Sequence, residues 1–239
     1  MTERIAIITN VFDSAGVPGV DALVDEGCLT LCHARAFSDP AARAAFEANG
    51  PNRVASSAET PAALAREAID RFGRVDVAVS NDFAQVLQGP FVDRSAEDYR
   101  ALLENFTVSS FCLAAAVVPK MIEQRSGRII FMTSGAALKP SPGLILYSAA
   151  RAATNQMVRS LAVEVAPYGI SVNAIAPAFF VSSFFPGGAD DPDLARLVKE
   201  HVPMQRHGRP EELAALIGVL ASGRADYISG QIIAFSGAS

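Results

Sequence analysis

Four times in this chain, a glycine at the end of a helical segment is followed at once by a run of β-prone, mostly apolar residues. A glycine in that place suits the left-handed C-cap that ends an α-helix, and four to six β-prone residues indicate a strand. The four junctions read "DEGCLTLCH", "RFGRVDVAVSND", "RSGRIIFMTS" and "PYGISVNAIAP". A helix that leads directly into a strand, repeated in this way, predicts an α/β fold.

The strands expected after these junctions are continuous apolar runs, and so are "RIAIIT" before them and "GQIIAF" after them. Continuous runs are typical of parallel strands that helices cover on both faces. Segments with helical period lie between the strands, among them "PEELAALIGVLAS", which begins like a first helical turn. We therefore predict a doubly wound parallel sheet of about seven strands with helices on both faces, formed by residues 1–239 as a single domain.

The composition argues against several classes of partner. Of the 239 residues, 50% are hydrophobic and 19% are charged, and the net charge is −5. No run of lysine or arginine marks a surface for nucleic acid or an anionic membrane, and no apolar run approaches the length of a membrane span. Cys28, Cys32 and Cys112 form no CxxC motif and no cluster with histidines, so we expect neither a disulfide framework nor a metal site. Because "MTERIAIITN" lacks a basic region and a cleavage site, we expect a soluble, cytoplasmic protein.

Open parallel sheets bind ligands beyond the C-terminal ends of their strands, at the point where the strand order reverses. Four stretches of this chain follow expected strands at that edge: "TNVFDSAG", "SNDF", "TSGAA" and "APAFFVSSFF". We therefore expect these four loops to form one site.

The first of the four loops is a poor nucleotide-binding loop. Dinucleotide sites place closely spaced glycines there, so that main-chain amides approach a pyrophosphate at a helix N-terminus. Here Asn10 stands where a glycine is usual, Phe12 adds bulk, Asp13 adds an anion and Pro18 lacks an N–H. A divergent but working loop is one interpretation. The other is that the chain has given up the nucleotide and refilled the space with aromatic side chains.

The end of the expected second strand leaves NADP open as a ligand. The stretch "CHARAF" offers His33 and Arg35 where NAD sites usually have an acidic residue for the ribose hydroxyls. Arg35 could hold a ribose 2′-phosphate, although a lone arginine at such a position is more commonly a solvated surface charge.

Tyr147 and Arg151, in "YSAAR", are four residues apart and so share one face of a helix. Ser134 precedes Tyr147 by thirteen residues, at the end of an expected strand. With this spacing the chain resembles the short-chain dehydrogenase/reductase superfamily, which has a serine and a Tyr-x-x-x-Lys motif. The arginine in place of lysine, the poor glycine loop, "VSND" and "APAFF" are similar to the halohydrin dehalogenases, a branch of that superfamily without a cofactor.

The resemblance implies a Rossmann-like fold, no cofactor, and a carbon–halogen lyase. Tyr147 would take the proton from the hydroxyl of a vicinal halohydrin, Ser134 would hold that oxygen, and Arg151 would keep Tyr147 deprotonated. The alkoxide would displace halide and leave an epoxide, which azide, cyanide, nitrite or halide could open in reverse. The residue types agree with this mechanism, because an arginine beside Tyr147 keeps its positive charge under all working conditions. A cation about 4–5 Å from a phenol favours the phenolate by about 3–4 kcal/mol at an effective dielectric constant of about 20.

A leaving halide needs a weakly polar, water-poor pocket. The residues that could form it are Phe12, Phe83, Pro177, Ala178, Phe179, Phe180, Phe184 and Phe185. Hydrophobic packing alone is the other interpretation of the four phenylalanines that follow Ala178, and the last two of them open "FFPGGADDPD", which reads as a loop with a helical flap behind it. Asp82 could support Arg151 by a hydrogen bond, directly or through water, or could cap a turn.

Two further implications concern assembly and alternative functions. Some members of the branch complete the halide pocket with a tryptophan from a neighbouring subunit, whereas this chain has no tryptophan, so we expect a more open pocket. The superfamily assembles through two long helices, expected here at about residues 98–124 and 145–166, so we expect a homotetramer.

An NADP-dependent reductase and a non-catalytic, ligand-binding relative remain alternatives, and the presence of Ser134, Tyr147 and Arg151 together argues against the latter.

Overall fold

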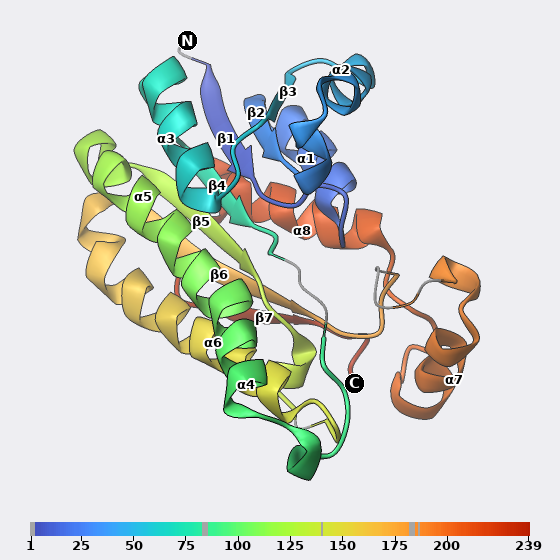
Figure 1. The fold of residues 1–239 in the computed structure, drawn as a ribbon. Coiled ribbons are helices and arrows are strands. Elements are labelled where there is room, and N and C mark those ends of the chain that lie inside the picture. Colours follow the sequence, from blue (N-terminus) through green and yellow to red (C-terminus); the bar gives the residue numbers. More distant parts are fainter. Residues whose placement is uncertain (1–2, 83–85, 140, 182–184, 186) are drawn as a thin grey trace.

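The protein is described by a computed structural model, in which residues 3–82, 86–139, 141–181, 185 and 187–239 are placed. A seven-stranded parallel sheet runs through it in the order β3-β2-β1-β4-β5-β6-β7 (Figure 1). The strands are β1 (Arg4–Ile8), β2 (Cys28–His33), β3 (Arg53–Ser56), β4 (Val77–Ser80), β5 (Gly127–Met132), β6 (Ile170–Pro177) and β7 (Ile232–Phe235). The strand order reverses between β1 and β4, as in Rossmann-like folds, so the prediction of a doubly wound parallel sheet is confirmed.

The described helices lie on both faces of the sheet. They are α1 (Gly16–Asp25), α2 (Pro40–Ala48), α3 (Pro61–Phe72), α4 (Ala96–Leu103), α5 (Ser109–Gln124), α6 (Ile145–Val165), α7 (Pro192–His201) and α8 (Pro210–Ala221). On one face, side chains from α1 and α8 pack against the strands. On the other face, α3, α5 and α6 do so.

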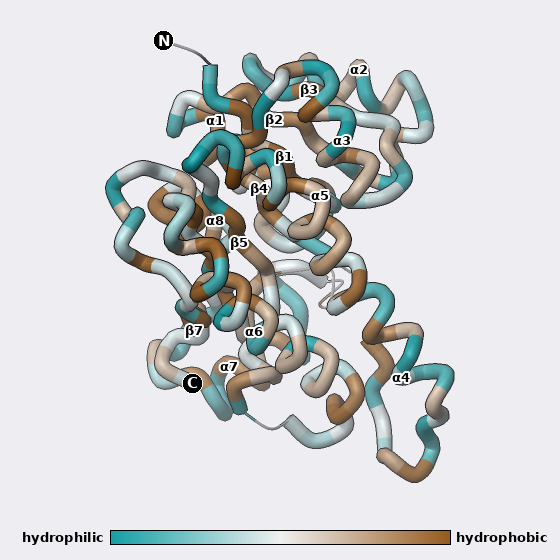
Figure 2. Tube along the Cα trace, turned by 90° about the vertical axis from the view of Figure 1, so that its left-hand side faces the viewer, coloured by the Kyte–Doolittle hydropathy of each residue, from teal (hydrophilic) through white to brown (hydrophobic). Residues whose placement is uncertain are grey.

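Successive residues of each central strand enter different hydrophobic cores. Ile8 packs with Val20 of α1, whereas the preceding Ile7 packs with Leu64 of α3 and Val117 of α5. In Figure 2 the strands are coloured mostly as hydrophobic, whereas the helices around them carry both polar and hydrophobic residues. The continuous apolar runs of the sequence therefore reflect burial on both sides of the sheet.

Three of the four expected glycine caps have the left-handed conformation. Gly27, Gly73 and Gly169 have φ angles of 78°, 72° and 73°. At the third junction the prediction is wrong, because Arg125 is the left-handed residue, with φ of 52°, and Gly127 begins β5. A Cβ atom on Gly127 would lie 2.3 Å from Sδ of Met121, so this glycine is required by packing rather than by a turn.

The two long helices have nearly the expected bounds, but the first is not regular. Between α4 and α5, residues Glu104–Val108 form a π-helical turn. The segment Ala96–Gln124 as a whole is long and apolar enough to cross a membrane by length and composition, with a mean hydropathy of 1.7 over its best window, 33% of which is buried. One side of it packs on α3 and the sheet, whereas Val108 and Phe111 are exposed.

Candidate active site

Ser134 is placed by the end of β5. The N–H of the preceding Thr133 donates to the carbonyl of Ile175 in β6, and Ser134 itself is extended and caps a short 3₁₀ turn, Gly135–Ala137. Its Oγ accepts a hydrogen bond from the N–H of Ala136 at 3.2 Å. Because the oxygen already accepts a bond from the main chain, the hydroxyl proton is left to donate toward a ligand.

Tyr147 and Arg151 lie on successive turns of α6, and their side chains meet. Nε of Arg151 donates to the phenolic oxygen of Tyr147 at 3.4 Å. The same guanidinium donates from Nη1 to the carbonyl of Met132 at 2.9 Å and from Nη2 to the carbonyl of Asp82 at 3.0 Å. Arg151 is only 4% exposed. Its position is therefore fixed by the ends of β5 and β4, and it presents a buried positive charge to the phenol.

Asp82 supports Arg151 through its main chain and not through its carboxylate. The carboxylate accepts hydrogen bonds from the hydroxyls of Thr9 at 3.1 Å, Ser80 at 2.6 Å and Ser110 at 3.2 Å. The expected side-chain contact with Arg151 is thus replaced by a contact of the carbonyl group. A buried carboxylate with three hydroxyl donors holds the loops after β1 and β4 together on α5.

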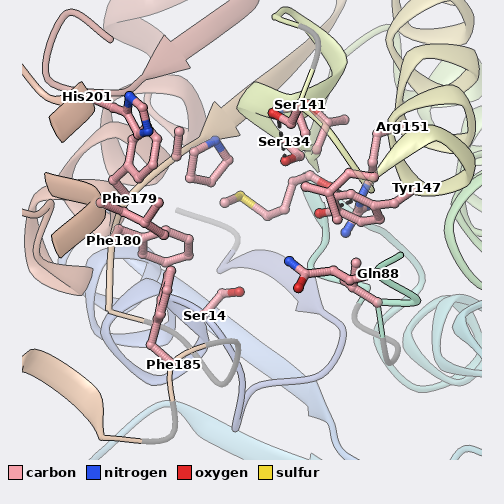
Figure 3. Close-up of a pocket in the computed structure, with 18 of the residues that line it drawn as sticks. Ser14, Gln88, Ser134, Ser141, Tyr147, Arg151, Phe179, Phe180, Phe185 and His201 are labelled. Carbon is pink, nitrogen blue, oxygen red and sulfur yellow. Dashed lines mark hydrogen bonds between the residues drawn. The ribbon is translucent and has the colours of Figure 1, made fainter. Parts of the chain in front are cut away.

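A cavity of about 350 Å³ opens at the C-terminal ends of the strands. Figure 3 shows Tyr147, Arg151 and Ser134 on one side of it and the aromatic rings of Phe179, Phe180 and Phe185 on the other. Pro177 and Ala178 also line it. All four loops that the sequence predicted to meet contribute to this cavity. A polar side that carries a hydroxyl, a phenol and a guanidinium thus faces a wall of aromatic carbon.

Several of the expected pocket residues are arranged differently. Phe12 is 57% exposed and does not line the cavity. Its ring packs edge-on against Phe37 at 5.3 Å and against Phe46 at 5.9 Å, beyond the end of β2. The N–H of Ala178 donates to the carbonyl of Phe235, so it is not available to a halide. Phe83 and Phe184 lie outside the described residues.

The flap contributes side chains that the sequence did not reveal. Asp191 caps α7 by accepting the N–H groups of Asp193 and Leu194. The hydrogen bond from the N–H of Gly187 lowers the pKa of the Asp191 carboxyl most, and those from Leu194 and Asp193 lower it further. Leu197 and His201 of α7 line the cavity, as do Ser14, Asn81, Val86, Gln88, Ser141, Pro142 and Leu144 from the loops. Ser14 and Asn81 belong to stretches that the sequence placed at the site, whereas tertiary packing alone brings the others there.

The first loop does not fit a nucleotide pyrophosphate. The carboxylate of Asp13 accepts the N–H of Ser14 at 2.5 Å, and the N–H of Gly16 donates to the carbonyl of Asp13. Pro18, in the first turn of α1, has no N–H. An anion and internal hydrogen bonds therefore occupy the helix N-terminus, where a phosphate would need free donors. The ring of Phe12 covers the aromatic residues beyond β2, near which the adenosine of a dinucleotide lies in this type of sheet.

His33 ties the end of β2 to this loop. Its Nδ1 accepts the N–H of Asn10 at 3.4 Å, and its carbonyl accepts the N–H of Val11 at 3.0 Å. Burial lowers the pKa of the His33 imidazole from its ordinary value of 6.5, an effect that the charge of Asp82 opposes. Neutral His33 thus acts as an acceptor for the loop, while Arg35, in the position considered for a ribose phosphate, is exposed.

The chain is similar both to proteins named as reductases and to proteins named as dehalogenases. The family model described as enoyl-(acyl carrier protein) reductase matches residues 41–237. A 3-oxoacyl-(acyl-carrier-protein) reductase of Synechocystis sp. is 32% identical over 97% of this chain and 94% of its own length. A solved structure described as a dehalogenation enzyme is 33% identical, covers 99% of this chain and 98% of its own, and has a TM-score of 0.93. A halohydrin dehalogenase bound to ethyl (2S)-oxiran-2-ylacetate is also 33% identical, over 98% and 96% of the two chains, with a TM-score of 0.92.

Proposed function

From the premise that this chain belongs to the short-chain dehydrogenase/reductase superfamily, we propose that it interconverts vicinal halohydrins and epoxides without a cofactor. The observation that carries this proposal is the buried guanidinium of Arg151, which contacts the phenol of Tyr147 at 3.4 Å and two main-chain carbonyls. The poor fit of the first loop to a pyrophosphate and the likeness to a halohydrin dehalogenase both support it.

In the forward direction, the hydroxyl of the halohydrin lies between Ser134 and Tyr147. Tyr147, as a phenolate, takes the hydroxyl proton, and the hydroxyl of Ser134 donates to the developing alkoxide. The electron pair of the alkoxide forms the new carbon–oxygen bond as the carbon–halogen bond breaks from the opposite side. The products are an epoxide, a halide ion and a protonated Tyr147, which returns its proton to water.

The charge of Arg151 is the part of this arrangement that would attract a phenolate at Tyr147. Its Nε–H points at the phenolic oxygen, and its buried position excludes the water that would otherwise weaken the attraction. The aromatic wall formed by Phe179, Phe180 and Phe185 faces the leaving group. In reverse, Tyr147 protonates the epoxide oxygen, and a small anion such as azide, cyanide, nitrite or halide opens the ring.

A nucleotide-dependent reductase is the second candidate. It is favoured by the family model and by the curated relative at 32% identity, both of which carry the names of reductases. This candidate requires the first loop to rearrange, because Asp13 and the internal hydrogen bonds of the loop stand in the place of the pyrophosphate.

The test is to mix the purified protein with a chlorinated vicinal halohydrin in the absence of nucleotide and to measure released chloride and protons. We expect release from the wild type, and a loss of most of the rate in Tyr147→Phe. Tyr227→Phe is the matched control, because Tyr227 is fully exposed on the surface. If no halohydrin yields chloride, and NADPH is consumed with a 3-oxoacyl substrate, the reductase is the correct assignment.

We also propose that the chain assembles as a homotetramer through the outer faces of α4, α5 and α6. Phe111 on α5 is 57% exposed and Val163 on α6 is 79% exposed, and such unpaired apolar faces on long helices suit an interface. Light scattering after size exclusion tests this. Phe111→Glu is expected to yield smaller species, whereas Val219→Glu, on α8 of the opposite face, is expected to leave the tetramer intact.

A further inference from the structure

Phe106 lies at the centre of the π-helical turn Glu104–Val108 and is completely buried. It belongs to none of the motifs that mark the site. Single π-helical turns within α-helices are rare and are frequently found at functional sites. The position of this turn, next to the helix that carries Tyr147 and Arg151, indicates a role for the residue that it presents.

The ring of Phe106 contacts both side chains of the proposed proton-transfer pair. The Cζ atom of Arg151 lies 4.0 Å from the centroid of the Phe106 ring. The ring of Tyr147 packs against the Phe106 ring in an edge-to-face arrangement, with centroids 5.2 Å apart and planes at 75°. By comparison, Arg151 Cζ is 5.5 Å from the Tyr147 centroid, so the nearer ring face for the cation is that of Phe106.

This contact matters because Arg151 is a buried cation that forms no salt bridge with a carboxylate among the described residues. Its hydrogen bonds go to the phenol of Tyr147 and to the carbonyls of Met132 and Asp82. A cation removed from water needs further electrostatic compensation. The negative face of an aromatic ring supplies it, and such an interaction is strongest where both groups are desolvated.

The main chain of the π-helical turn is fastened to α6 at the level of Arg151. The single hydroxyl proton of Ser110 is shared between the carbonyl of Phe106 at 2.8 Å and the carboxylate of Asp82 at 3.2 Å. That of Thr154 is shared between the carbonyls of Phe106 and Ala150, each at 3.3 Å. The hydroxyl of Thr107 donates to the carbonyl of Ala150 at 2.9 Å. Hydrogen bonds of the Phe106 carbonyl and of the neighbouring Thr107 therefore fix the backbone of the turn. They hold the Phe106 ring against the guanidinium in addition to side-chain packing.

We infer that Phe106 is a positioning residue of this site, whose ring face holds the guanidinium of Arg151 in the orientation that directs Nε to the phenolic oxygen of Tyr147. The effect on rate rests on the proposed function, whereas the effect on the orientation of Arg151 does not.

Substitution of Phe106 by mono-, di- and trifluorophenylalanine tests the electrostatic part of this inference. Each added fluorine withdraws charge from the ring face and leaves its shape nearly unchanged, so cation–π attraction weakens stepwise. We expect the logarithm of the rate of halide release to fall with each fluorine, to a total loss of about 10- to 30-fold. The same series at Phe131, which is fully buried in β5 and lies against no cation among the described residues, should leave the rate nearly constant. A flat series at Phe106, or an equal slope at Phe131, would overturn the inference.

A second readout does not depend on activity. In nitrogen-15 NMR of the wild type, the Nε–H of Arg151 should exchange slowly with water and carry a ring-current shift. In Phe106→Leu this proton should exchange faster. If the leucine variant does not fold, the exchange rate should instead increase with each fluorine in the fluorinated proteins. If the wild type releases no halide, the proposed function fails and the NMR result still decides the inference. If the wild type is active and neither readout responds to Phe106, the inference fails and the function stands.

Discussion

Removing the charge of Arg151 should cost most of the activity, and the structure gives the size of the effect. With Nε 3.4 Å from the phenolic oxygen, the attraction between the guanidinium and a phenolate is about 4–5 kcal/mol at an effective dielectric constant of about 20. Water that enters the space left by Arg151→Met recovers part of this energy. We therefore expect a loss of about 100-fold or more in rate, equivalent to about 2.7 kcal/mol.

The assay is halide release in single-turnover conditions, with circular dichroism and thermal unfolding as checks on folding. Arg151→Met also leaves the carbonyls of Met132 and Asp82 without their donor, so the free energy of unfolding should fall by about 1–3 kcal/mol for each. Arg151→Lys keeps the charge but has no fork of donors to span both carbonyls, and it should lose about 10-fold in rate. A folded Arg151→Met protein within about 3-fold of the wild-type rate would refute this reasoning.

Three further predictions concern stability. Because burial holds the pKa of His33 below its ordinary value of 6.5, the unfolded chain binds more protons between the two values. The free energy of unfolding should therefore be highest above about pH 6.5, decrease as the pH falls from there to the folded pKa, and level off below it. Thermal unfolding across this range should show the decrease, and His33→Gln, which does not titrate, should flatten it. Asp82→Asn replaces an acceptor of three hydroxyl donors with a group that also donates, and urea unfolding should show a loss of about 1–3 kcal/mol. Gly16→Ala places a Cβ atom 2.3 Å from the carbonyl oxygen of Val11 and should lower the melting temperature by several degrees, whereas Gly218→Ala, with its nearest atom at 3.5 Å, should not.

The fold could be predicted from the sequence because local and global signals agree. Left-handed glycines, continuous apolar strands and helical periods each report on the same doubly wound sheet. The exception at Gly127 is informative. A glycine before a strand is required there by the side chain of Met121, and a sequence does not distinguish a glycine needed for its φ angle from one needed for its missing side chain.

The candidate site could be predicted where its chemistry depends on residues close in sequence, or on loops that a parallel sheet brings to one edge. The spacing of Ser134, Tyr147 and Arg151 follows from one strand end and one helix turn, so a motif records it. The contact between Asp82 and Arg151 uses a carbonyl group, which every residue type has, and residue identity therefore carried no information about it. Phe106 approaches from a separate helix, and Phe12 turns toward Phe37, through packing that no local pattern specifies.

The π-helical turn at Glu104–Val108 also sets the rotational phase between two helices. Each residue advances an α-helix by about 100° around its axis, and a π-helical turn accommodates one residue more than an α-helical turn. Leu102 of α4 packs toward Leu146 of α6, whereas Leu113 of α5 packs with Leu64 of α3. Deleting a single residue from the turn would preserve a helix but rotate one of these faces away from its partner. The number of residues in this segment, independently of their identity, is thus what allows one apolar helix to pack in two directions.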